Sequence, residues 1–220
     1  MGCAGPSRRV ALAPIVSTIQ RASTSRLASR GLDSHVVLLS IGVALFVGVH
    51  LVPSTPALRA RLVERVGFNR YRGLFSLVSL VGIVMIVIGM GAAPMVPLWT
   101  PPSWSFKASI LGMPFAFILL AAAYMPTNLK RVMRHPMLWG VAVWAGLHLV
   151  SNGDLASLIL FGGFGAFAFF DMGSANRRGA ERSQVKLPWP RDLLPIVVGL
   201  VVYAVVLYYH QTLFGRAVLL

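Results

Sequence analysis

Acidic residues, and charged residues of any kind, are scarce in this sequence. Only 12% of the 220 residues are charged, against roughly a quarter in a typical soluble domain, and the mean hydropathy is +0.74. This composition excludes an ordinary water-soluble domain. The single cysteine, Cys3, excludes an internal disulfide and any metal site built from cysteines. A cofactor would therefore have to be held by other side chains.

Long apolar runs take the place of the missing charges. A membrane-spanning helix needs about 20 apolar residues, because unpaired backbone groups are too costly in hydrocarbon. Six uncharged windows meet or approach this length, which predicts an all-α fold, an integral membrane bundle of six transmembrane helices in the lipid bilayer. The windows are 36–52, 74–93, 108–125, 137–151, 155–172 and 193–214. The fourth is the shortest, and Asn152, Gly153 and Asp154 predict a tight turn after it, with Asp154 stabilising the turn through its side chain.

Basic residues gather in alternate loops, and this pattern predicts the orientation. A formal net charge of +14 would suggest nucleic-acid binding in a polar protein, but here the charges lie between apolar runs, so no nucleic-acid partner is expected. The rule that basic loops stay inside places the loops after the first, third and fifth spans in the cytoplasm and both termini on the outer side. These loops carry Arg59, Arg61, Arg65, Arg70, Arg72, Lys130, Arg131, Arg134, Arg177, Arg178, Arg182, Lys186 and Arg191.

Residues 1–34 break this pattern, because they are basic on the side predicted to be outside. We interpret them as a disordered basic leader, either a transit peptide or the product of a start codon assigned too far upstream. The transmembrane domain is then expected over residues 35–216. The expected location is a bacterial inner membrane, or an organelle membrane if the leader is a transit peptide.

Histidines within the spans are the candidate functional residues, since ionisable groups in a membrane are expensive. His50 lies near the cytoplasmic end of the first span, His148 lies in the fourth, and His135 precedes Pro136. A neutral imidazole bonded to a carbonyl of a neighbouring helix is one interpretation of His148, and ligation of a haem iron is the other. Two histidines on different helices can bind one iron from opposite faces.

Aromatic side chains near His148 could form the walls of a slot for a haem or another apolar small molecule, although they also suit ordinary helix packing. They are Trp139, Trp144, Phe161, Phe164, Phe167, Phe169 and Phe170. Hydrolase chemistry has no support, because the spans contain no paired carboxylates, and Asp171 alone lies at a span end.

Several motifs together carry a family resemblance. They are FVGVH at 46–50, Leu58-Arg59, Gly67, YRGLFSL at 71–77, RHPMLWG at 134–140, then Trp144, His148 and NGD at 152–154. In this combination the chain resembles the NnrU family of small membrane proteins, over roughly residues 36 to 214. The predicted transmembrane domain is therefore NnrU-like.

The resemblance implies a haem b protein that supports nitrite and nitric oxide metabolism, as bacterial members of the family do. Plant relatives are 15-cis-zeta-carotene isomerases, so a haem-dependent cis-trans isomerase is the alternative, and a cofactor-free membrane assembly factor is a third. His50 and His148 match the positions proposed to ligate that haem, and His135 matches the Arg-His-Pro motif. Ala145 stands where the isomerases have a cysteine, which puts their ligand-switching mechanism in doubt here.

The depths of the histidines in the membrane favour a different partner for His50. A helix rises about 1.5 Å per residue, so His50 lies roughly 9 Å to the cytoplasmic side of its span's middle and His148 about 5 Å to the outer side of its own. By depth alone, His135 suits His50 better as a partner. His50 and His148 remain the first choice, with His135 as the alternative.

Overall fold

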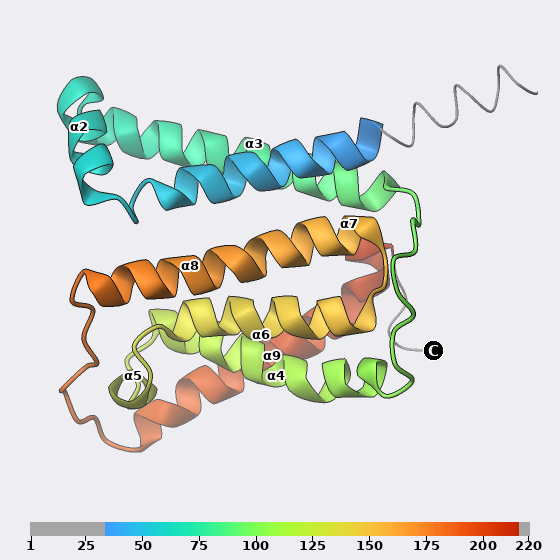
Figure 1. The fold of residues 1–220 in the computed structure, drawn as a ribbon. Helices are drawn as coiled ribbons and strands as arrows, with labels where there is room; N and C mark the ends of the chain where they lie inside the picture. The colour runs from blue at the N-terminus through green and yellow to red at the C-terminus, as the bar shows by residue number, and fades with distance from the viewer. Residues whose placement is uncertain (1–33, 216–220) are drawn as a thin grey trace, which may run out of the picture.

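The computed structural model describes residues 34–215 as an all-helical chain (Figure 1). The helices are the first helix Ser34–Leu51, α2 Pro56–Val66, α3 Phe68–Ala92, α4 Ser105–Tyr124, α5 Leu129–Val132, α6 Pro136–Ser151, α7 Leu155–Ser157, the π-helical turn η1 Leu158–Gly162, α8 Gly163–Arg177 and α9 Pro190–Phe214. The predicted leader lies, apart from Ser34, outside the described residues.

Five helices are long and apolar enough to cross a membrane: the first helix, α3, α4, α7 to α8 as one continuous rod, and α9. They confirm five of the predicted spans by length and composition. The fourth predicted span is α6, with 16 residues. At 1.5 Å per residue α6 is about 24 Å long, short of the roughly 30 Å of a bilayer core.

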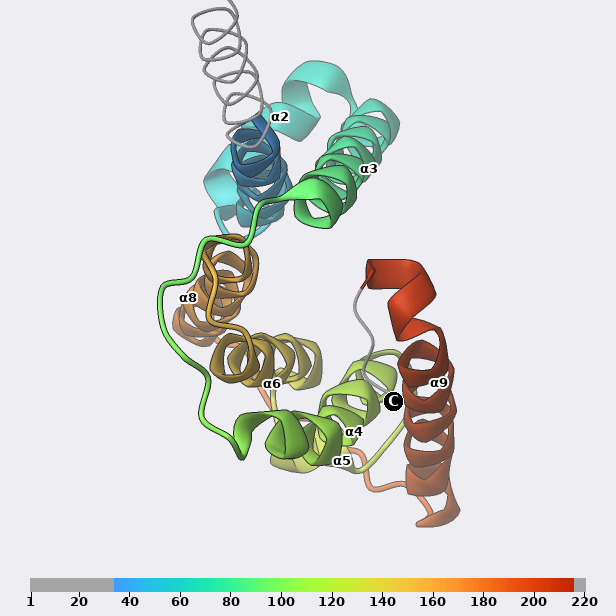
Figure 2. The same ribbon diagram turned by 90° about the vertical axis from the view of Figure 1, so that its right-hand side faces the viewer.

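The long helices and α6 lie side by side in one curved layer. In the order α3, first helix, α8, α6, α4 and α9, each packs on the next, and Figure 2 shows the layer as an arc with α3 and α9 at its two ends. Close approach within the layer needs small residues: a Cβ added to Gly89 of α3 would lie 2.6 Å from the backbone nitrogen of Leu39. At most 33% of the apolar window of any spanning helix is buried in the protein, which leaves the rest of its surface to lipid.

The main buried cluster lies where the first helix, α6 and the α7 to α8 rod meet. Its members come from these helices and from α3, and they are Leu39, Val43, Ile86, Ala145, Ala156, Leu160 and Phe161. The middle of the arc is therefore its best-packed part.

Loops of different charge lie at opposite ends of the bundle (Figure 1). The α2 segment, α5 and the 178–189 loop, all rich in arginine or lysine, share one end. The 93–104 segment and the turn between α6 and α7 lie at the other, together with the start of the first helix and the end of α9. This is the alternation that the basic residues predicted. The membrane side that each end faces stays a prediction.

The 93–104 segment crosses the turn between α6 and α7 as a strap. The amides of Leu98 and Trp99 donate to the carbonyl of Gly153 at 2.6 and 3.2 Å, and the amide of Leu155 donates to the carbonyl of Val96 at 2.9 Å. A Cβ on Gly153 would lie 1.9 Å from the Trp99 carbonyl oxygen, so only glycine fits beneath the strap. The predicted turn is confirmed, but its glycine serves this close approach and has no positive φ.

Asp154 stabilises the same turn, as predicted. Its carboxylate is 2% exposed and accepts hydrogen bonds from the amide of Ser157 at 3.0 Å and from the hydroxyl of Ser157 at 2.7 Å. This is an N-cap for the helix that begins at Leu155.

Candidate functional site

His148 lies near the end of α6, among aromatic rings. Its ring stacks on Phe161 with centroids 4.4 Å apart, and the Trp144 ring lies 5.4 Å away. Its Nδ1 atom lies 2.9 Å from the carbonyl oxygen of Trp144. Because a carbonyl only accepts, Nδ1 carries the proton, and Nε2 of a neutral ring keeps its lone pair.

His50 lies near the end of the first helix and repeats this arrangement. Its ring stacks on Phe46 at 4.1 Å and has Phe75 of α3 and Phe167 of α8 at 4.9 and 6.1 Å. Its Nδ1 donates to the carbonyl oxygen of Phe46, 2.7 Å away and one turn earlier in the helix. Both histidines are half-buried, and both therefore present Nε2 as the atom free to bind a metal.

A chain of ring contacts joins the two histidines. Phe46 stacks on Phe164 at 5.2 Å, and Phe164 lies 5.7 Å from Trp144. We call this group the aromatic cluster, and its members are Phe46, His50, Phe75, Trp144, His148, Phe161, Phe164 and Phe167. The cluster places the predicted residues His50, His148 and Trp144 in one continuous apolar environment.

The spacing of the phenylalanines along the α7 to α8 rod explains the cluster. Phe161, Phe164 and Phe167 follow one another at intervals of three and so lie along one face, towards α6 and the first helix. Phe169 and Phe170 are 59% and 54% exposed and lie outside the cluster, so the expectation that they form its walls was wrong. Trp139, 41% exposed, contacts Phe169 and also lies outside.

The two imidazoles lean towards each other along the bundle. Their neighbours on the α7 to α8 rod, Phe167 for His50 and Phe161 for His148, are separated by about 9 Å of helix rise. Each Nδ1 bonds a carbonyl one turn earlier in its helix, and the first helix and α6 run in opposite directions (Figure 1). Both rings therefore tilt from opposite ends towards the middle of the cluster.

A tyrosine with an unsatisfied hydroxyl lies close to the His50 end. Tyr71 precedes Phe75 by one turn of α3, with ring centroids 6.4 Å apart. Its hydroxyl is the one buried side-chain polar atom in the described part of the chain that has no hydrogen-bond partner. Arg59 lies over the Tyr71 ring, 6.0 Å from its centroid. A buried polar atom without a partner is costly, so this hydroxyl fits a polar group supplied from outside the chain.

His135 lies apart from the aromatic cluster, at the start of α6. Its Nε2 lies 2.9 Å from Oδ1 of Asn176, and Arg134 donates to the same oxygen at 3.3 Å. Because an arginine only donates, the shared atom is an acceptor, and His135 must donate from Nε2. A protonated Nε2 has no lone pair for a metal. In this arrangement His135 links α6 to α8 rather than facing His50.

A cluster of polar side chains lies just after the end of the first helix, beyond His50, and was not predicted from the sequence. The Ser54 hydroxyl donates to the Asp171 carboxylate at 2.5 Å, and Arg178 lies 3.7 Å from the same carboxylate. Arg178 also donates to the backbone oxygen of Ser54 at 2.6 Å. This is the one ion pair among residues 34–215, and it ties the end of the first helix to α8. The sequence feature that could have indicated this cluster is the isolated Asp171 at the end of an apolar span.

The donor set fits a haem better than a free metal ion. The described residues contain no group of three or more His, Cys, Asp or Glu side chains placed to hold an ion, whereas a haem iron needs only axial ligands. Two imidazoles with available Nε2 atoms, aromatic neighbours and an unsatisfied hydroxyl match that need. The rings of Phe46 and Phe164 occupy the contact path between the imidazoles, so they would have to rotate for both to reach one iron.

Comparison with known proteins identifies one family. A family model described as NnrU protein matches residues 38–218. The matched range includes every member of the aromatic cluster. Neither a curated protein nor a solved structure matches the chain.

Proposed function

The chain belongs to the NnrU family, and from that premise we propose that it binds haem b through His50 and His148 and supports nitrite and nitric oxide metabolism. The observation that carries the proposal is the shared hydrogen-bond pattern of these two imidazoles at opposite ends of one aromatic cluster. The metabolic role rests on the resemblance to bacterial members of the family.

The hydrogen bonds of the two histidines are what an axial ligand requires. A histidine that binds a metal usually donates its other ring N–H to a carbonyl or carboxylate, which fixes both the tautomer and the ring orientation. Both bonds are made within the histidine's own helix, so the orientation does not depend on a neighbouring helix. The first helix and α6 would each contribute one ligand.

Residues around the two histidines would bind the haem and shield it from water. Haem b supplies a one-electron redox centre when it is bound. Trp144, Phe161 and Phe167 would contact the porphyrin and exclude water. Arg59 and the hydroxyl of Tyr71 would hold a propionate at the basic end of the bundle, which would satisfy the Tyr71 hydroxyl.

Isomerase activity, the alternative that the plant relatives imply, has less support. Ala145 stands where those enzymes have a cysteine, and it is 1% exposed. Its Cβ lies 3.5 Å from the position that a Cβ on Gly165 would take, in the contact between α6 and α8. Residue 145 therefore offers no sulfur as an exchangeable ligand. A redox role for the haem needs no such exchange.

Haem binding is tested on the full chain, purified in mild detergent from cells supplied with a haem precursor. The measurement is the reduced-minus-oxidised difference spectrum, for wild type, His50→Ala, His148→Ala and, as the matched control, His135→Ala. We expect a sharp haem b band that falls at least about tenfold in the first two variants, because each removes an axial ligand. The control keeps the band.

Three results would contradict the proposal. A colourless wild-type protein would favour the cofactor-free assembly factor, and loss of the band in His135→Ala would identify the rival ligand. A band of undiminished height in either His50→Ala or His148→Ala would exclude joint ligation. The metabolic role is tested separately, by whether wild type but not His148→Ala restores nitrite respiration to a host that lacks its own family member.

A further inference from the structure

An open pocket lies at the basic end of the bundle, between α5, the start of α6, the end of α8 and the loop that follows α8. It has a volume of about 560 Å³ and is separate from the aromatic cluster. Its lining includes three cationic side chains from three segments: Lys130 of α5, Arg134 before α6, and Arg182 of the loop. Three cationic side chains around one pocket need a counter-charge, either from the protein or from a ligand.

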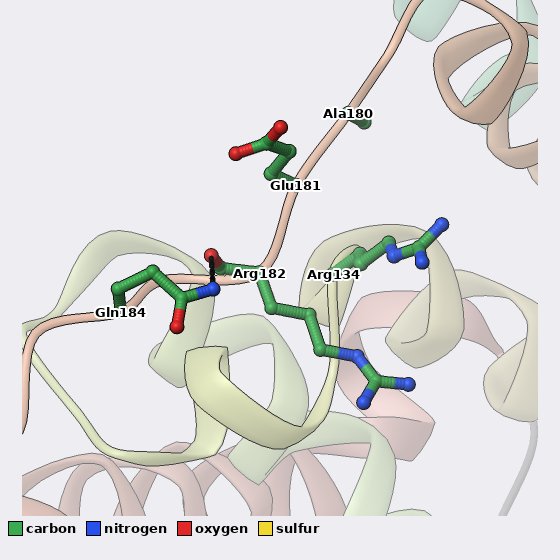
Figure 3. Close-up of a pocket in the computed structure, with 5 residues that line it drawn as sticks. All are labelled: Arg134, Ala180, Glu181, Arg182 and Gln184. Atoms are coloured by element: carbon green, nitrogen blue, oxygen red, sulfur yellow. Dashed lines mark hydrogen bonds between the residues drawn. The ribbon is translucent and has the colours of Figure 1, made fainter.

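The protein itself does not neutralise these cations. In the described chain neither Lys130 nor Arg182 has a side-chain hydrogen bond or ion pair, and Arg134 bonds only the neutral Asn176. The carboxylate of Glu181 also borders the pocket, but Figure 3 shows it pointing away from the guanidinium groups of Arg134 and Arg182. Asp171 is already engaged by Ser54 and Arg178. The pocket therefore keeps a net positive charge.

The start of α6 adds to that charge. His135 is the N-cap residue and makes no side-chain capping bond, and Pro136 has no amide hydrogen. Pro136, Met137 and Leu138, the first residues of this 16-residue helix, line the pocket, which therefore lies at the positive end of the helix dipole. An oxyanion is the ligand that both features favour.

The pocket wall is fixed in place. The amide of Ser183 donates to the carbonyl of Lys130 at 3.0 Å, which holds the loop against α5. Further along the loop, Asn128 donates to the carbonyl of Leu187 and accepts from its amide, both at 2.9 Å. The loop is therefore bonded to α5 and to its N-cap residue Asn128 at two points that follow Arg182 in the chain.

One part of the lining is apolar and continues onto the exposed surface of the helices. Ala123, Met137 and Leu138 line this part, and Met137 is 42% exposed. Beside it on α4, Tyr124 is 80% exposed, and its hydroxyl lies 3.4 Å from the sulfur of Met137, an aromatic position typical of the membrane interface. A ligand with a phosphate group and acyl chains would satisfy both parts of the lining, whereas a free phosphate would satisfy only the cations.

We propose that this pocket binds the phosphate of an anionic phospholipid headgroup through Lys130, Arg134 and Arg182, with the acyl chains lying along Met137 and Tyr124. Basic pockets between helices on the positive side of a membrane protein are suited to such lipids. The site is independent of haem binding.

The test is native mass spectrometry of the detergent-purified full chain, titrated with short-chain phosphatidylglycerol. Phosphatidylcholine and inorganic phosphate serve as the other two arms. The pocket variant is Arg134→Gln with Arg182→Gln. The matched control, Arg65→Gln with Arg70→Gln, removes the same charge from exposed positions on α2 and α3.

We expect one phosphatidylglycerol per chain in preference to phosphatidylcholine, weakened at least about tenfold in the pocket variant, because two charge-assisted contacts are lost. The control should stay within about twofold of wild type. Arg182→Gln alone, which removes no hydrogen bond, replaces the double variant if that one fails to fold, with a loss in the same direction expected.

Equal losses in the pocket and control variants would overturn the proposal, because they would show an effect of overall charge. Equal binding of both lipids would overturn it as well. Displacement of phosphatidylglycerol by millimolar inorganic phosphate, with no preference for the lipid, would identify a soluble phosphate compound as the ligand and overturn the lipid assignment.

Discussion

Replacing Gly153 by alanine should detach the strap from the turn between α6 and α7. The added Cβ would lie 1.9 Å from the Trp99 carbonyl oxygen, whereas a close carbon–oxygen contact is about 3.3 Å, so the strap must retreat by about 1.4 Å. That movement breaks the two hydrogen bonds from Leu98 and Trp99 to the Gly153 carbonyl and strains the bond from Leu155 to Val96. At about 1 kcal/mol for each bond, the expected loss is about 2–3 kcal/mol of unfolding free energy.

The assay is unfolding in mixed micelles with increasing sodium dodecyl sulfate, followed by tryptophan fluorescence. The matched control is Gly146→Ala, the same substitution within α6 at a position where a Cβ meets nothing within 4 Å. It should be neutral or stabilising by up to about 1 kcal/mol, since alanine favours helix over glycine. Equal unfolding free energies for Gly153→Ala and Gly146→Ala would refute the assigned role of the strap.

Two further substitutions test the packing. Asp154→Ala should lower the unfolding free energy by about 2–4 kcal/mol, because it removes an N-cap and leaves the Ser157 hydroxyl buried without its partner. Asp154→Asn keeps an acceptor and should lose less than half as much; equal losses in the same denaturant titration would contradict the cap. Gly199→Leu should destabilise by about 2–3 kcal/mol, because a Cβ there lies 2.6 Å from the Ile118 backbone, whereas Gly91→Leu, in open space, should be near neutral. The contact between α4 and α9 would be misassigned if these two variants unfolded alike.

The lengths of the apolar runs predicted the long helices of the fold. They did not predict the helical segments that carry charged residues. The window 74–93 found the apolar part of α3, but the helix begins at Phe68 and includes Arg70 and Arg72. Window counting stops at charged residues, whereas a helix continues into the membrane interface where such side chains reach water. For the same reason α2 was expected as a loop, although its eleven residues start with a proline at N1 or N2, a position that suits a helix start.

The candidate site was predictable in its residues but not in their arrangement. Rarity of histidine in apolar spans identified His50 and His148, and the spacing of Trp144 marked the same face of α6. The stacking of His148 on Phe161, the contacts of His50 with Phe75 and Phe167 and the unsatisfied hydroxyl of Tyr71 depend on which helices are neighbours. Sequence periodicity alone does not give the order in which the helices pack side by side.

The most direct test of the central claim is low-temperature electron paramagnetic resonance of the ferric protein with its haem bound. Two imidazoles on one iron, one from the first helix and one from α6, predict a low-spin ferric spectrum in wild type that changes to high spin in both His50→Ala and His148→Ala. A high-spin spectrum in wild type, or a low-spin spectrum that persists in both variants, would contradict the account.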